Sequence, residues 1–243
     1  MSSKLIRNHV LLASIAFNFS IFLKPPTAIA AKIDDAKSTL AIVTEKEGVA
    51  SALAHRHIIV ATRWSSKLDL KLNGKGSIES GSAEISIPVA DLVVDSPEAA
   101  KGILSILSAG NIWDASKHNL SPENSAKVRE NMLAESQLDA AKSPRIESQG
   151  VITSCRERES HSFVCILDLT VTIKGRSVKR SLQINLNSND GEWRADFLGR
   201  FKFTEFDIKP YTALLGAIAV SNEFVLAGKL VARDEGVIRD GKK

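Results

Sequence analysis

The chain has 243 residues and a formal net charge of +4, and 44% of its residues are hydrophobic but only 5% are aromatic. Residues 1–30 contain three of the basic residues and no acidic one, so the net charge of the remainder is +1. That remainder shows no cluster of lysines and arginines. Its charge therefore argues against a nucleic-acid partner and against binding to a membrane surface through basic residues.

Residues 1–30 have the three parts of a secretory signal peptide. Lys4 and Arg7 form a basic beginning, residues 10–23 are mostly apolar, and Ala28-Ile29-Ala30 is a small-x-small cleavage site. The alternative is a membrane anchor, but the apolar run has only fourteen residues, and a spanning helix needs about twenty. We therefore predict cleavage after Ala30 and a periplasmic location.

About 213 residues then remain, which fits one barrel or sandwich domain. No Pro-, Gly- or Ser-rich linker divides them, and no second run is long enough to form a membrane span. We expect one domain at residues 31–232, followed by a polar tail at residues 233–243.

Cys155 and Cys165 lie on either side of the polar segment at residues 156–162. If that segment turns at Ser160, the two cysteines face each other across a hairpin, and an oxidising compartment favours a disulfide between them. Two buried free thiols are the alternative. Neither cysteine belongs to a CxxC motif, which argues against redox catalysis.

Apolar and polar residues alternate along most of the chain, the pattern of strands with one wet face. An apolar set runs from Phe163 to Ile173 and ends at Lys174-Gly175, and Asp190-Gly191 forms a second predicted turn. We expect further strands at residues 38–44, 48–64, 68–72, 85–89, 145–154, 182–186, 193–206 and 222–232. Nine or ten short strands at this spacing are typical of an up-and-down barrel or a sandwich.

The pattern changes between residues 96 and 142. Ser96-Pro97-Glu98 and Ser121-Pro122-Glu123 each offer a hydroxyl N-cap, a proline at the first helical position and an early acid. We predict a helical insertion at about residues 96–142 that caps one end of the barrel or covers part of its wall. The apolar loop at residues 211–218 is expected to be a lid over the barrel mouth or to pack against these helices.

Five stretches of the chain, at residues 56–60, 82–92, 132–146, 168–175 and 201–208, carry a family pattern through their order and spacing. Among them are a histidine before an apolar strand, a Pro-Val corner, and a Leu-Thr-x-x-x-Lys-Gly hairpin. In this order they resemble the YceI-like family of lipid- or polyisoprenoid-binding proteins, over residues 38–232. The chain departs from the family where residues 64–68 replace a Gly-x-Phe and where Asp207 replaces a glycine.

The resemblance implies an all-β fold, an extended antiparallel lipocalin-like barrel of about eight strands whose interior holds an isoprenoid or another long apolar lipid. Such a carrier needs no catalytic group and no cofactor, because each CH₂ taken from water contributes about 0.8 kcal/mol. The expected apolar small-molecule site is the barrel interior, with contributions from His55, His57, Ile59, Phe163, Leu167, Leu169, Phe201 and Phe203.

His55 and His57 are two residues apart, so in a strand their side chains point to one face. If that face is the interior, the imidazoles are placed to bond the polar head of a ligand. The alternatives are a metal-binding protein or metal-dependent enzyme built on this pair, and an envelope stress or interaction module with no ligand. A homodimer is compatible with the sequence.

Overall fold

The computed structural model describes residues 27–49, 55–73, 76–113, 121–213, 215 and 217–237. Its strands, in chain order, are β1 (Thr27–Ile33), β2 (Thr39–Glu47), β3 (Ile58–Ala61), β4 (Ser65–Leu72), β5 (Ile78–Pro88), β6 (Leu92–Val94), β7 (Arg145–Glu159), β8 (Ser162–Ile173), β9 (Arg176–Asn189), β10 (Glu192–Lys202), β11 (Thr212–Ala213) and β12 (Ile218–Val237). The helices are α1 (Pro97–Ala100), α2 (Leu104–Ala109) and α3 (Pro122–Leu133), with 3₁₀ turns η2 (Val89–Asp91) and η4 (Phe203–Phe206).

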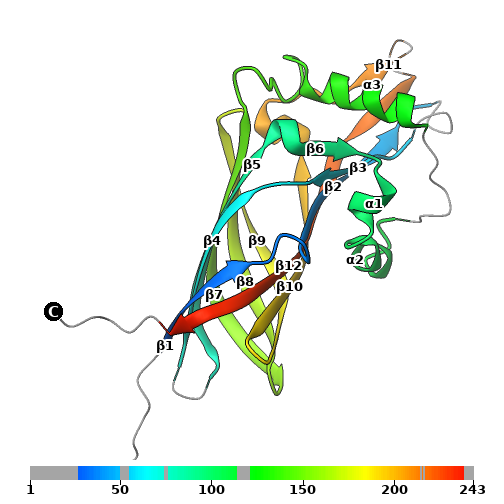
Figure 1. The fold of residues 1–243 in the computed structure, drawn as a ribbon. Coiled ribbons are helices and arrows are strands. Elements are labelled where there is room, and N and C mark those ends of the chain that lie inside the picture. The colour runs from blue at the N-terminus through cyan, green and yellow to red at the C-terminus, as the bar shows by residue number, and fades with distance from the viewer. Residues whose placement is uncertain are drawn as a thin grey trace, which may run out of the picture.

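The strands form one long antiparallel barrel (Figure 1). Within the described residues, eight of them close a ring in the order β1-β4-β5-β7-β8-β9-β10-β12, because β1 pairs with both β4 and β12. The first part of β12 pairs with β2, which continues the wall through β3 and β6. The predicted barrel of about eight strands with a helical insertion is therefore confirmed.

Two tight turns set the register of the longest strands. Ile173 pairs with Arg176 around Lys174-Gly175, and Asn189 pairs with Glu192 around Asp190-Gly191. All four turn residues have positive φ, between 47° and 76°. This is the type I′ geometry whose twist matches that of antiparallel strands, and a glycine in second position adopts it without strain.

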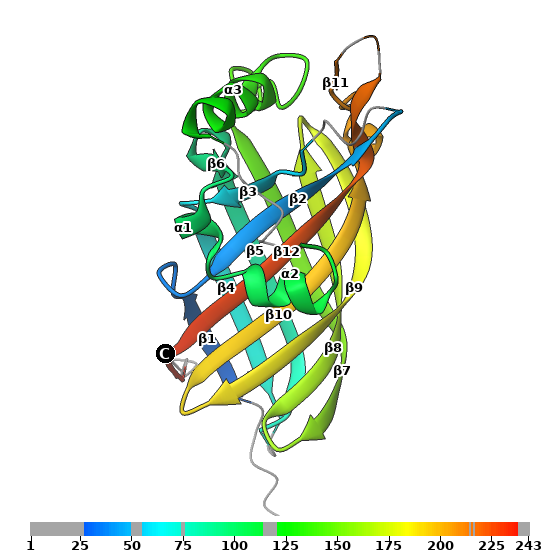
Figure 2. The ribbon, with the colours of Figure 1, turned by 90° about the vertical axis from the view of Figure 1, so that its right-hand side faces the viewer.

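The helices lie outside the barrel wall (Figure 2). The Ser96 and Ser121 hydroxyls accept hydrogen bonds from the N–H groups of Ala99 and Asn124, so both predicted N-caps form. The first predicted helix is two short ones, α1 and α2. Between them Gly102 lies so close to β2 that an added Cβ would be 2.3 Å from the Thr39 hydroxyl.

A second, smaller core joins α1 and α2 to the outer face of the wall. Its buried members come from the two helices, from β2, β3 and β12, and from the residues after α2: Ala41, Val43, Ile58, Val60, Ala100, Ile103, Leu107, Ile112, Trp113, Val225 and Ala227. The main core fills the barrel itself. The insertion therefore covers the wall through α1 and α2, while α3 lies over one end (Figure 2).

We call the end that carries α3, β11, η4 and the β8–β9 turn the mouth end, and the opposite end, with the β7–β8 and β9–β10 turns, the hairpin end (Figure 1). Predicted cleavage after Ala30 falls inside β1 and would leave residues 31–33 of that strand paired with β12 and only Ala31 paired with β4, at Leu68. Residues 1–26 and 238–243 lie outside the described residues. No helix in the described part of the chain is long and apolar enough to cross a membrane.

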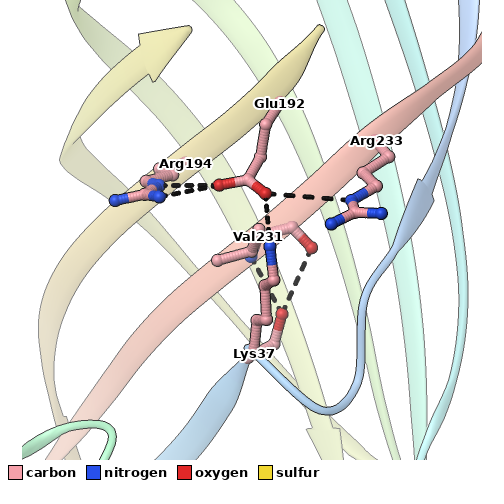
Figure 3. Close-up of polar contacts among 6 residues, drawn as sticks. Lys37, Glu192, Arg194, Val231 and Arg233 are labelled. Carbon is pink, nitrogen blue, oxygen red and sulfur yellow. Dashed lines mark hydrogen bonds and ion pairs between the residues drawn. The ribbon is translucent and has the colours of Figure 1, made fainter. Parts of the chain in front are cut away.

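At the hairpin end a cluster of charges joins three parts of the wall (Figure 3). The Lys37 ammonium, in the β1–β2 turn, lies 2.6 Å from the Glu192 carboxylate, and Arg194 and Arg233 approach the same carboxylate at 2.8 and 3.8 Å. Lys37 and then Arg194 lower the pKa of Glu192 to about 2. The Ser38 hydroxyl also bonds the backbone N–H and C=O of Val231. The β1–β2 turn is thus fixed to β10 and β12.

Candidate functional site

The interior of the barrel holds two apolar cavities. One, of about 80 Å³, lies toward the hairpin end and is lined by Leu70, Leu167 and Trp193 among others. The other, of about 40 Å³, lies nearer the mouth and is lined by Ile59, Phe201 and Leu226 among others. Neither has a charged residue in its lining. The site is therefore suited to hydrocarbon.

Phe197 lines the cavity toward the hairpin end. Its ring lies against Gly228 of β12, so closely that a Cβ on Gly228 would be 2.2 Å from ring atoms. Gly228 lies between Leu226, which lines the cavity nearer the mouth, and Leu230, which lines the other. Gly199 of β10 likewise leaves its space to the Leu182 methyl groups. The glycines give the barrel room at this level, and side chains from other strands occupy it.

A third cavity, of about 150 Å³, lies at the mouth end between α3, β2, β3 and the segment before β11. Its apolar lining includes Ile59, Met132 and Phe203, and its polar lining includes His57 and Gln137. Ile59 also lines the neighbouring apolar cavity. The three cavities thus follow one another along the barrel, apolar inside and partly polar at the mouth.

His57 is held at this mouth by Asp95, the residue after β6. The His57 Nδ1 atom is 2.7 Å from Asp95 Oδ2, and Asp95 Oδ1 accepts the backbone N–H of Ile58 at 2.9 Å. The Asp95 side chain is 1% exposed and that of His57 is 13% exposed. A carboxylate only accepts hydrogen bonds, so Nδ1 carries the proton. Nε2 makes no hydrogen bond to the described residues and remains for a ligand.

Asp95 reaches this position because its backbone is left-handed, with φ of +51°. Aspartate is one of the few non-glycine residues that adopt this conformation readily. The Asp95 N–H donates to the Ile58 carbonyl at 2.8 Å, so main chain and side chain both bind the start of β3. The ends of β3 and β6 are locked together beside the cavity. Asp95 could not be predicted as a site residue, because nothing in the sequence around it indicates this role.

A positively charged side chain also lies near the mouth end of the barrel interior. Arg180 of β9 alternates with the buried residues Val178 and Leu182, pairs with Glu205 of η4 and lies 5.6 Å above the Phe201 ring. Burial opposes the charge on Glu205, but the Lys202 N–H and the Arg180 guanidinium outweigh it and lower the pKa of Glu205. Glu205 thus belongs to a turn, although a strand was expected over residues 193–206, and Asp207 after it takes the left-handed conformation, with φ of +59°.

The residues expected to bind a ligand do not all line the same cavity. Ile59, Leu167 and Phe201 line the interior cavities, and His57 and Phe203 line the mouth cavity. Leu169 and Phe163 are buried in the main core, Phe163 near the hairpin end beside Trp193. His55 is exposed, and because β3 begins only at Ile58, neither histidine lies in a strand and the two do not share a strand face. The strand expected over residues 48–64 begins only at Ile58, and residues 50–54 lie outside the described residues.

Two other features concern the chemistry of the chain. A disulfide joins Cys155 and Cys165, which are directly paired on β7 and β8 with Cα atoms 4.0 Å apart. In the part of the chain that the structure describes, no three His, Cys, Asp or Glu side chains gather as a metal site. The hydrogen-bond partner of the His57 ring is Asp95, and not His55, the other histidine of the pair considered for metal binding.

No model of a known protein family matches the sequence, and no curated protein matches it either. Solved structures do match the fold. BcnA from Burkholderia cenocepacia is 15% identical with a TM-score of 0.51, covering 82% of this chain and 99% of its own. A polyisoprenoid-binding domain from Saccharophagus degradans, implicated in plant cell wall breakdown, is 11% identical with a TM-score of 0.50, covering 85% of this chain and 99% of its own.

The two likenesses define the class of this protein as a single-chain antiparallel barrel. A Campylobacter jejuni YceI protein variant also matches, at 10% identity and a TM-score of 0.43, with 95% of this chain and 100% of its own covered. The fold is YceI-like. At these identities the comparisons establish the fold alone.

Proposed function

We propose that this protein binds an isoprenoid or another long apolar lipid inside its barrel and carries it in the periplasm. The observation that carries the proposal is the series of three cavities, apolar inside and polar only at the mouth. This is the arrangement that a hydrocarbon chain with one polar head requires. The polyisoprenoid binding named for the Saccharophagus degradans domain supports the same ligand class.

The ligand chain displaces side chains when it enters. The interior cavities of about 80 and 40 Å³ hold only part of a long chain as they stand. Phe197 and Leu182 occupy the space above Gly228 and Gly199, and we expect these two side chains to turn when the ligand chain enters. Burial of about 0.8 kcal/mol per CH₂ offsets the cost of the new rotamers, which is of the order of 1 kcal/mol each.

His57 binds the head of the ligand. The mouth cavity is lined by no lysine or arginine, so a neutral head suits it better than a charged one. With Nδ1 committed to Asp95, Nε2 of the neutral ring accepts a hydrogen bond from a hydroxyl group, and the charged ring donates one to a carbonyl. Binding of this kind needs no chemistry on the ligand, and we propose a carrier and not an enzyme.

Native mass spectrometry of protein purified from its own host tests the proposal directly. We expect a bound apolar mass, and the intact mass also reports whether the chain begins at Ala31, as export requires. A variant that fills the inner cavity, Ala195→Phe, should lose this mass, because Ala195 lines that cavity. Val151→Phe is the matched control, since Val151 is 52% exposed on the outer face of β7. Retention of the ligand by folded Ala195→Phe protein would contradict an interior site.

A further inference from the structure

Exposed apolar side chains gather at the mouth end. In the described part of the chain five large apolar side chains are exposed: Val49, Val151, Ile166, Tyr211 and Leu215. Val151 and Ile166 lie on the barrel wall, on β7 and β8. The other three belong to two loops at the mouth end, where Val49 is 97% exposed and Leu215 is fully exposed. We call Val49, Tyr211 and Leu215 the apolar tip.

The strand pairing brings the two loops together. Glu47 at the end of β2 pairs with Ala219 of β12, which places Val49 two residues beyond that pair. Ala213 pairs with Ile218, so Leu215 lies in the turn between β11 and β12, and the Val220 N–H donates to the Tyr211 carbonyl at 2.9 Å. Figure 2 shows the end of β2 beside β11 and the start of β12. The tip residues therefore lie on two loops that the strand pairing makes neighbours.

The two loops of the apolar tip differ in charge from the hairpin end and from the rest of the mouth end, where α3 and the β8–β9 turn carry charged residues such as Lys127 and Lys174. Neither residues 48–54 nor residues 211–220 include a charged residue. At the hairpin end, by contrast, the β7–β8 turn is flanked by Glu157, Arg158 and Glu159, and the β9–β10 turn contains Asp190. Two uncharged loops with exposed apolar side chains, on an otherwise charged surface, indicate a contact with an apolar phase or partner.

Leu215 adds a second unusual feature at the tip. Its φ is +56°, in the left-handed region, where a leucine is strained by about 1 kcal/mol and a glycine or asparagine is not. The same residue therefore combines a strained backbone with a fully exposed apolar side chain. Neither feature stabilises the free protein, so both point to a role in a bound state.

We propose that the apolar tip inserts into a lipid bilayer, so that the mouth cavity opens onto the lipid. Tyr211 belongs to the tip and also lines that cavity, beside Val220 and Met132. Val49 and Leu215 are single side chains that are almost fully exposed, which suits insertion into a fluid apolar phase better than a fitted contact with a partner. Its border is mixed in charge, with Lys46, Glu47 and Lys209, so binding depends on apolar insertion and only weakly on lipid charge.

Co-sedimentation of the full protein with phosphatidylcholine vesicles tests the inference. The tip variant replaces Val49 and Leu215 with aspartate, and its matched control replaces Val151 and Ile166 with aspartate. Each pair places two carboxylates on exposed sites, so we expect both variants to fold, which thermal unfolding verifies. We expect the wild type and the wall variant to sediment alike, and the affinity of the tip variant to fall at least about tenfold, since burying one leucine contributes that much or more.

Three outcomes would overturn the inference. They are a wild type that stays in the supernatant, tip and wall variants that weaken binding equally, and binding that needs phosphatidylglycerol and disappears in high salt. The ligand proposal is tested separately, because uptake of geranylgeraniol in vesicle-free solution should be the same in the tip variant and the wild type. If uptake is intact while vesicle binding is absent, the docking inference fails and the carrier function stands.

Discussion

The His57 imidazole and the Asp95 carboxylate, 38 residues apart in sequence, form one hydrogen-bonded unit with Nδ1 and Oδ2 2.7 Å apart. The carboxylate is almost fully buried and also fixes the backbone at Ile58. The pair thus holds the start of β3 to the end of β6, and it fixes the orientation of the imidazole that lines the mouth cavity. A histidine fixed in this way presents the same nitrogen to each ligand molecule.

Replacing His57 with leucine separates head binding from chain binding. We expect His57→Leu to bind geranylgeraniol about five- to tenfold more weakly, the loss of one hydrogen bond, while the affinity for the matching hydrocarbon without the hydroxyl is unchanged. Fluorescence displacement of a bound apolar dye measures both affinities. His55→Leu is the control, because His55 is exposed and does not line the mouth cavity. Equal losses for alcohol and hydrocarbon would show that His57 only packs.

The barrel was predictable because its evidence is local. Lys174-Gly175 and Asp190-Gly191 are turn sequences for any antiparallel pair, and the apolar residues of β8 alternate over its whole length. The split between α1 and α2 was not predictable, because it depends on the close approach of Gly102 to Thr39 on a strand distant in sequence. The same holds for the site. His57 was found from its own residue type, but its pairing with Asp95 depends on a left-handed backbone and on β3–β6 pairing.

Gly228 should tolerate no side chain while Phe197 occupies its present place. A Cβ would lie 2.2 Å from the Phe197 ring, so we expect Gly228→Ala to lower the free energy of unfolding by about 2 kcal/mol through overpacking. Adding Phe197→Leu should recover part of this loss, which a double-mutant cycle from urea unfolding measures. Gly199→Ala is the milder comparison, because a flexible leucine methyl lies 2.9 Å away. Additive effects of the two substitutions at Gly228 and Phe197 would contradict the contact.

The Cys155–Cys165 disulfide should stabilise the hairpin end. It closes a loop across a sequence separation of 10, and the chain-entropy model gives about 3 kcal/mol for a loop of this size. We expect the Cys155→Ala/Cys165→Ala variant to lose stability of this order. In thermal unfolding, dithiothreitol should lower the midpoint of the wild type and leave that of the double variant unchanged. A reductant effect of equal size on both proteins would exclude the disulfide as the cause.

Glu192 should make the stability of the protein depend on pH in the acid range. Lys37 and Arg194 lower its pKa from 4.5 to about 2 in the folded state, so the folded protein binds this proton less tightly than the unfolded chain. The stabilisation is then complete above about pH 4.5 and is lost as the pH falls toward 2. We expect Glu192→Gln to be less stable than the wild type at pH 7, with a difference that narrows between pH 4.5 and 2, measured by urea unfolding at each pH.

Glu84→Gln is the control, since Glu84 is 58% exposed and its partner Lys67 is 3.8 Å away. We expect little change in the stability of that variant at any pH. A deficit in Glu192→Gln that stays constant down to pH 2 would mean that packing, and not the charge cluster, stabilises this end of the barrel.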